Sequence, residues 1–93
     1  MSQETKLNLL SAVMDLKRVA TGYQNGSPKM AERFKDEAIN RLSKTAITEL
    51  KPYIRNIIHN LPDELNLGED SARAETALTY SVIIQNYALA SSS

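Results

Sequence analysis

The sequence predicts an all-α fold, a small helical bundle of three long helices and one short helix, in a single domain over residues 1–93. Apolar side chains recur at steps of three and four residues, which is the period of one helix face. Dipeptides that contain glycine or proline interrupt this period at only a few places. The apolar fraction of 42% is enough for one hydrophobic core in a chain of this length.

The first predicted helix covers residues 3–23. Its apolar stripe advances by steps of four, three, four and three residues through Leu9, Val13, Leu16, Ala20 and Tyr23. Asn25-Gly26 ends this helix, because both residues tolerate a left-handed backbone conformation.

A second helix begins at Ser27-Pro28. Serine accepts a hydrogen bond from a free backbone N–H of the first turn, and proline at the first helical position has no N–H to leave unpaired. No more than three residues separate the two helices, so we expect an N-terminal antiparallel helical hairpin. The core stripe of the second helix is Ala31, Phe34, Ala38, Leu42 and Ala46, flanked by Met30, Ile39 and Leu50.

Lys51-Pro52 interrupts the second helix, because proline disfavours helical geometry at the preceding residue and lacks a backbone donor. The helix either kinks here or stops, and we favour a stop. A short helix follows and ends at Leu61-Pro62. Its apolar face consists of Tyr53, Ile54, Ile57, Ile58 and Leu61.

The last predicted helix covers residues 72–90 and is apolar almost all round, with no charged side chain after Glu75. Leu78, Val82 and Leu89 lie on one arc, and Tyr80, Ile84 and Tyr87 lie on another. This pattern indicates a helix buried by several neighbours, so we expect it to be the central helix of the bundle. Its apolar stretch is shorter than the ~20 residues that a membrane span requires. We expect residues 91–93 to be frayed.

The short neighbouring helices are too few to cover such a helix completely. We therefore predict self-association, in the form of a two-fold homodimer through the last helix, with Tyr80, Ile84 and Tyr87 at the interface. The function favoured by this pattern is a small interaction or oligomerisation module, an adaptor or regulatory subunit without catalytic activity, with a protein partner as a further option. The absence of cysteine and of a secretion-signal pattern favours a cytoplasmic location.

Charge is unevenly distributed, although the net charge is zero. Residues 17–55 hold nine basic side chains against four acidic ones, whereas residues 56–93 hold one against five. Either the basic side chains of the first stretch pair with the acidic side chains of the second on neighbouring helices, or the basic stretch forms a surface that binds nucleic acid. The basic candidates are Lys29, Arg33, Lys44 and Lys51, with Lys17, Arg18, Lys35, Arg41 and Arg55 in the same stretch.

One histidine and no cysteine exclude a zinc site with several nitrogen or sulfur ligands unless chains share it, and no cofactor motif is present. Arg55 and His59 are four residues apart, so they share a helix face. An arginine can hold a phosphate while a histidine acts as acid or base. Arg55-Asn56 and His59 resemble the R-N-x-x-x-H signature of HEPN-type helical ribonucleases, with a spacing one residue shorter. The resemblance implies a metal-independent ribonuclease as a third hypothesis.

Overall fold

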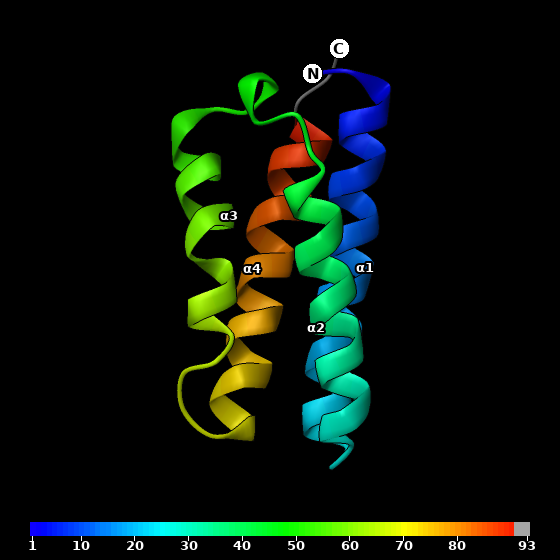
Figure 1. Ribbon diagram of the computed structural model, residues 1–93, viewed down its shortest axis with the longest axis vertical. Coiled ribbons are helices and arrows are strands. Elements are labelled where there is room, and N and C mark those ends of the chain that lie inside the picture. Colours follow the sequence, from blue (N-terminus) through cyan, green and yellow to red (C-terminus); the bar gives the residue numbers. More distant parts are fainter. Residues whose placement is uncertain (91–93) are drawn as a thin grey trace.

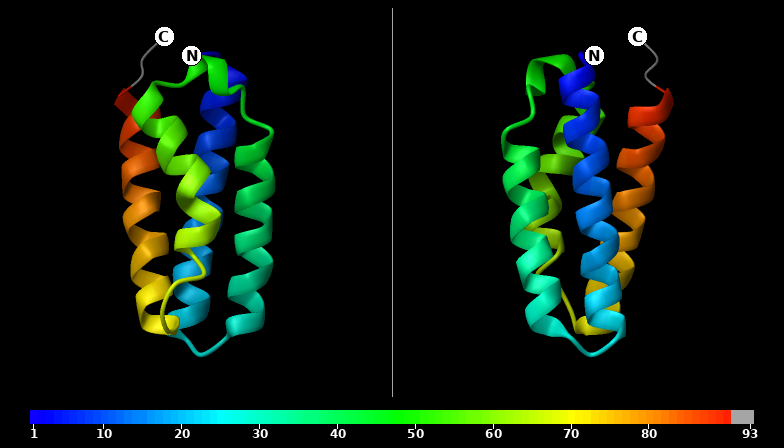
Figure 2. Two further views of the ribbon diagram at one scale, coloured as in Figure 1. Left: turned by 60° about the vertical axis from the view of Figure 1, so that its left-hand side comes forward. Right: turned by 90° about the vertical axis from the view of Figure 1, so that its right-hand side faces the viewer.

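The computed structural model describes residues 1–90, and within them the fold is all-α, with no strand, as predicted. Its helices are α1 (Gln3–Gln24), α2 (Pro28–Ser43), α3 (Pro52–Glu64) and α4 (Asp70–Ala90), and a single 3-10 turn, η1, covers Ile47–Glu49. The four α-helices lie side by side and alternate in direction (Figures 1 and 2), in a body of 39 × 20 × 19 Å. The expectation for residues 91–93 falls outside the described part of the chain.

Helix α1 is the element against which the others assemble. It packs along its length against α2 on one flank and α4 on the other. The side chains that it buries include Leu9, Ala12, Val13, Leu16, Val19, Ala20 and Tyr23, which contain the predicted stripe. The central position that the sequence pattern assigned to the last helix therefore belongs to the first.

Both ends of α1 are fixed by short-range chemistry. At the beginning, the Ser2 hydroxyl caps the helix by accepting the backbone N–H of Thr5 at 3.2 Å. Glu49 of η1 accepts the Thr5 hydroxyl at 2.9 Å and also the backbone N–H of Ser2, so the connection between α2 and α3 is tied to α1. These donors lower the pKa of the Glu49 carboxyl, with the Ser2 N–H as the largest cause.

At the other end of α1, three residues connect it to α2. Gly26 has a φ of 71°, the left-handed conformation that the sequence predicted for this turn. Ser27 occupies the N-cap position of α2, but its hydroxyl makes no capping hydrogen bond. Helices α1 and α2 pack closely next to this turn, because a Cβ atom added to Gly22 would lie only 2.8 Å from the backbone nitrogen of Ala31. The hairpin therefore depends on a residue without a side chain at position 22.

Helix α2 ends at Ser43, earlier than the predicted stripe, which continued to Ala46. At this end of the helix, the hydroxyl of Ser43 donates a hydrogen bond to the carbonyl of Asn40 at 2.7 Å, and the hydroxyl of Thr45 donates one to the carbonyl of Arg41 at 3.2 Å. Such side-chain bonds to the backbone compete with helix continuation. Ala46 is exposed as a result.

Helix α3 starts at Pro52, after an extended Lys51, so the structure has the favoured stop and not a kink. The predicted end at Leu61-Pro62 is wrong, because α3 continues through Pro62 for one more turn, to Glu64. Proline removes one backbone donor there. Leu61 and Leu65 are both fully buried, and the burial of these two leucines offsets the lost hydrogen bond.

Helix α4 is covered by α1 and, to a smaller extent, by α3. It buries Ala74, Ala77, Ser81, Ile84, Tyr87 and Ala88. Leu78, Val82 and Leu89 remain 39%, 51% and 55% exposed, respectively. One side of this apolar helix is thus left uncovered, and none of the described helices is long and apolar enough to cross a membrane.

We predict that Gly22→Ala destabilises the protein, although alanine favours helix over glycine by about 1 kcal/mol. The added methyl group meets backbone atoms of Ala31, which cannot rotate away, and overpacking of this kind costs about 1–3 kcal/mol. Urea unfolding should show the loss as a lower midpoint. Thr21→Ala, at the exposed neighbouring position, is the control and should change the midpoint little. A variant at position 22 that is more stable than the wild type would show that α2 moves away freely.

Candidate functional site

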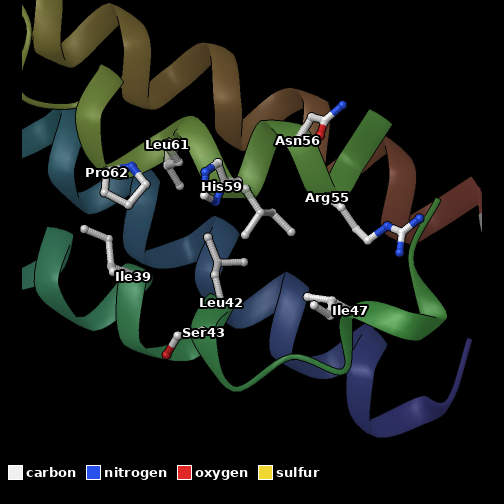
Figure 3. Close-up of a pocket in the computed structure, with 10 residues that line it drawn as sticks. Ile39, Leu42, Ser43, Ile47, Arg55, Asn56, His59, Leu61 and Pro62 are labelled. Atoms are coloured by element: carbon white, nitrogen blue, oxygen red, sulfur yellow. The ribbon is translucent and has the colours of Figure 1, made fainter. Parts of the chain in front are cut away.

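A groove with a volume of about 540 Å³ lies between α2 and α3. It exists because these two helices hardly contact each other, whereas each packs against another partner. Figure 3 shows the two walls, from α2 with the turn that follows it and from α3. The lining side chains are Ile39, Leu42, Ser43, Ile47, Arg55, Asn56, Ile58, His59, Leu61 and Pro62. Most of these are apolar.

Arg55 and His59 both line this groove, from one face of α3. Both side chains are exposed, and neither makes a hydrogen bond or an ion pair with another described residue. The ribonuclease hypothesis requires both side chains to line an open cleft, and they do. Among the lining residues, however, His59 is the only side chain suited to acid or base catalysis near neutral pH. The arrangement suits the binding of a single anionic group better than a proton relay, and cleavage stays an untested prediction.

The proposed nucleic-acid contacts Lys29, Arg33, Lys44 and Lys51 are all exposed. They do not form one cluster, because Lys29 and Lys44 stand near opposite ends of α2, about 22 Å apart along the axis. Asp36 and Glu37 lie between them on the same helix. A polyanion would therefore meet acidic side chains within the row of basic ones.

Two other members of the basic stretch, Arg18 and Arg41, are already paired with an acidic side chain of the same chain. Asp15, on α1, is 2% exposed and accepts a hydrogen bond from the Arg41 guanidinium of α2 at 2.9 Å. Arg18 lies 3.4 Å from the same carboxylate. The sequence analysis did not single out Asp15. The signal that could have found it is its position, three residues after the buried Ala12 and four before the buried Val19.

A second polar cluster links four parts of the chain at the end of the molecule where α1 meets α2. Glu32 accepts hydrogen bonds from the Tyr23 hydroxyl and from Lys35 Nζ, the latter at 2.7 Å. Lys35 also donates to Asn66 Oδ1 at 2.8 Å, in the loop before α4. Arg73 of α4 lies 6.0 Å from the Tyr23 ring centre, in cation–π geometry.

These contacts shift two titrating groups in opposite directions. The hydrogen bond from Lys35, followed by that from Tyr23, lowers the pKa of Glu32. Burial, followed by the hydrogen bond to Glu32, raises the pKa of the Tyr23 hydroxyl.

No described ion pair joins the basic stretch to the acidic residues 63–75, so the alternative in which the two halves of the chain neutralise each other is not seen.

The predicted interface residues lie mainly inside the chain. Ile84 is fully buried and Tyr87 is 7% exposed. Tyr87 accepts the Lys51 backbone N–H at 3.1 Å and contacts the Tyr53 ring edge to face, with centres 5.9 Å apart. Tyr80 is half-buried, and burial raises the pKa of its hydroxyl. Ile84 and Tyr87 are therefore core residues of one chain and are not available to a partner.

The apolar side chains of α4 that remain accessible are those of the other arc, Leu78, Val82 and Leu89. The sequence analysis described both arcs but proposed the other one, with Tyr80, Ile84 and Tyr87, for the interface. No group of three or more histidine, aspartate or glutamate side chains that could hold a metal ion occurs within residues 1–90.

Comparison with known proteins adds no identification. No protein family, no curated protein and no solved structure matches this chain.

Glu32 provides a pH-dependent prediction. Its folded-state pKa is below that of the unfolded chain, so its contribution to stability is present above pH ~4.3 and is lost as the pH falls through the folded-state pKa. At pH 7, Glu32→Gln should lower the free energy of unfolding by at most about 1 kcal/mol, because its carboxylate is half-exposed.

On acidification below pH ~5 the wild type should approach the variant, because protonation removes the same charge. Urea unfolding at a series of pH values measures this difference. Glu75→Gln, an exposed acid of α4, controls for the change in net charge. A difference between wild type and Glu32→Gln that stays constant down to pH ~3 would contradict the role of Glu32.

Proposed function

We propose that this chain is a small cytoplasmic interaction module, without catalytic activity, in which the helical bundle self-associates as a two-fold dimer. The observation that carries the proposal is the uncovered side of α4, formed by Leu78, Val82 and Leu89. These side chains are between 39% and 55% exposed. Large apolar residues grouped on one face of a helix are typical of a protein interface.

The spacing of these residues suits helix-to-helix packing. Val82 follows Leu78 by four residues and precedes Leu89 by seven. Steps of four and seven keep side chains on the seam of a coiled coil, where each can insert between side chains of a facing helix. Gln85, at the intervening seam position, is half-buried.

Helix α1 extends the apolar surface. Leu7 and Met14 are seven residues apart on its outer side and are 54% and 49% exposed. The contact between Tyr23 and Arg73 sets the level of the two antiparallel helices. Met14 is as many residues from Tyr23 as Val82 is from Arg73, so these two side chains lie at the same level along the helix axes. The same count places Leu7 at the level of Leu89.

A second copy of this chain is the partner that the surface favours. From Thr76 to Ala90 the described part of α4 carries no charged side chain. Two such helices can therefore approach each other around a two-fold axis without repulsion between like charges. A charged partner would find no complementary group along this stretch. The alternatives, nucleic-acid binding and RNA cleavage, have no comparable surface in their support.

We expect sedimentation equilibrium to give about twice the chain mass of 10.3 kDa. Val82→Glu should yield a folded monomer, because this position is half-exposed within one chain and only the dimer buries it. Ile84→Glu would not test the interface, since it places a charge in the core.

Leu67→Glu is the matched control. Leu67 is 60% exposed but lies in the loop before α4, so the same substitution should leave the dimer intact. Circular dichroism and thermal unfolding establish that both variants are folded. A wild type that remains monomeric at its highest attainable concentration, or a dimer that Val82→Glu leaves unchanged, would contradict the proposal.

A further inference from the structure

We propose that the groove between α2 and α3 binds a free medium-chain fatty acid, with the carboxylate at Arg55 and His59 and the hydrocarbon chain along the apolar walls. This inference is independent of the proposed dimer, because no groove-lining residue belongs to α4 or to the outer side of α1. It rests on three properties of the groove: its walls, its charge and its length.

The walls of the groove offer an apolar ligand a preformed surface. Leu42 and Leu61, at 2% and 0% exposure, form the floor, and the half-buried Ile39 and Ile58 form the sides. Ile47 is 54% exposed and stands at the end nearest Arg55 (Figure 3). The volume of about 540 Å³ falls within the range typical of small-molecule sites.

The charge of the groove favours an anion. Arg55 carries a permanent positive charge, and the imidazole of His59 can donate a hydrogen bond in either protonation state. The lining residues include no acidic side chain to neutralise Arg55. Arg18 and Arg41, by contrast, pair with Asp15. The groove thus combines an uncompensated cation with a largely apolar cleft, which is the complement of a carboxylate on a hydrocarbon chain.

The length of the groove limits the chain. Arg55 and Pro62 stand at opposite ends of the α3 wall (Figure 3), and seven residues of helix rise by about 10 Å. An extended chain advances by about 1.2 Å per bond, so about eight to ten carbons fill this distance. The structure therefore favours octanoate and decanoate over short carboxylic acids.

The experiment is isothermal titration calorimetry of the full chain with hexanoate, octanoate, decanoate and the uncharged analogue decanol. Each methylene added up to the length of the groove should lower Kd by at most about fourfold. Backbone amide shifts in a two-dimensional NMR titration should change around Ile39, Ser43 and Ile58. Saturable decanoate binding at those amides is the expected result. Its absence, or changes confined to other parts of the chain, would overturn the proposal.

Three exposed positions separate the contributions of head group and chain. Arg55→Gln should weaken decanoate binding about tenfold, because a charge-assisted contact is lost, and should leave decanol unchanged. Ile47→Asn should weaken both ligands alike. Arg33→Gln removes an exposed arginine of α2 that stacks on Phe34 outside the groove, and it should change neither affinity. Equal decanoate affinities for wild type and Arg55→Gln would overturn the assignment of the head group.

The variants also distinguish this proposal from self-association. Val82→Glu changes a residue outside the groove, so a monomeric variant should still bind decanoate with the affinity of the wild type. Loss of decanoate binding in that monomer would show that the dimer creates the site and would overturn the single-chain groove proposed here.

Discussion

Helix α1 has to bury two flanks at once, and the remaining helices are arranged by this requirement. One flank meets α2 so closely that residue 22 has to be glycine, and the other flank carries the apolar side chains that receive α4. Helix α3 is left without a flank of α1 and packs mainly against α4. The last helix is therefore shared between two neighbours and still retains an uncovered side.

Besides its apolar packing, helix α3 has specific contacts near each of its two ends. At its beginning, Lys51 donates to the Tyr87 hydroxyl and the Tyr53 ring contacts the Tyr87 ring. After its last turn, Asn66 accepts from Lys35 of α2. Between these attachments α2 and α3 diverge, and the groove with Arg55 and His59 lies in the gap (Figure 3). Apolar side chains from both helices line it because neither helix has the other as a full partner.

The local features of the fold were predictable because they depend on neighbours in sequence. The helix period, the left-handed Gly26 and the start of α3 at Pro52 are of this kind. The common face of Arg55 and His59 was also predictable, since it follows from a spacing of four residues. The groove beside that face was not predictable, because it depends on how far α3 stands from α2.

The position of each helix in the bundle was harder to predict than the presence of the helix. A helix that is apolar on all sides looks the same in sequence whether its own chain or a partner covers it, so the pattern of α4 could not separate the buried Ile84 from the exposed Val82. Charge misled in a similar way. The burial of Asp15 was not predicted, because the partner that makes its burial acceptable, Arg41, is 26 residues away.

The groove also changes the meaning of the Arg55 and His59 pair. In isolation, an arginine and a histidine on one helix face suggest contact with a phosphodiester, as the nuclease resemblance implied. A phosphate backbone presents a series of charges and requires several cations in a row, whereas the walls next to Arg55 are those of Ile47, Ile58 and Leu42. One cation beside an apolar cleft is matched by a ligand with one charge and a hydrocarbon body. The surroundings of the pair, more than its spacing, therefore decide which chemistry it suits.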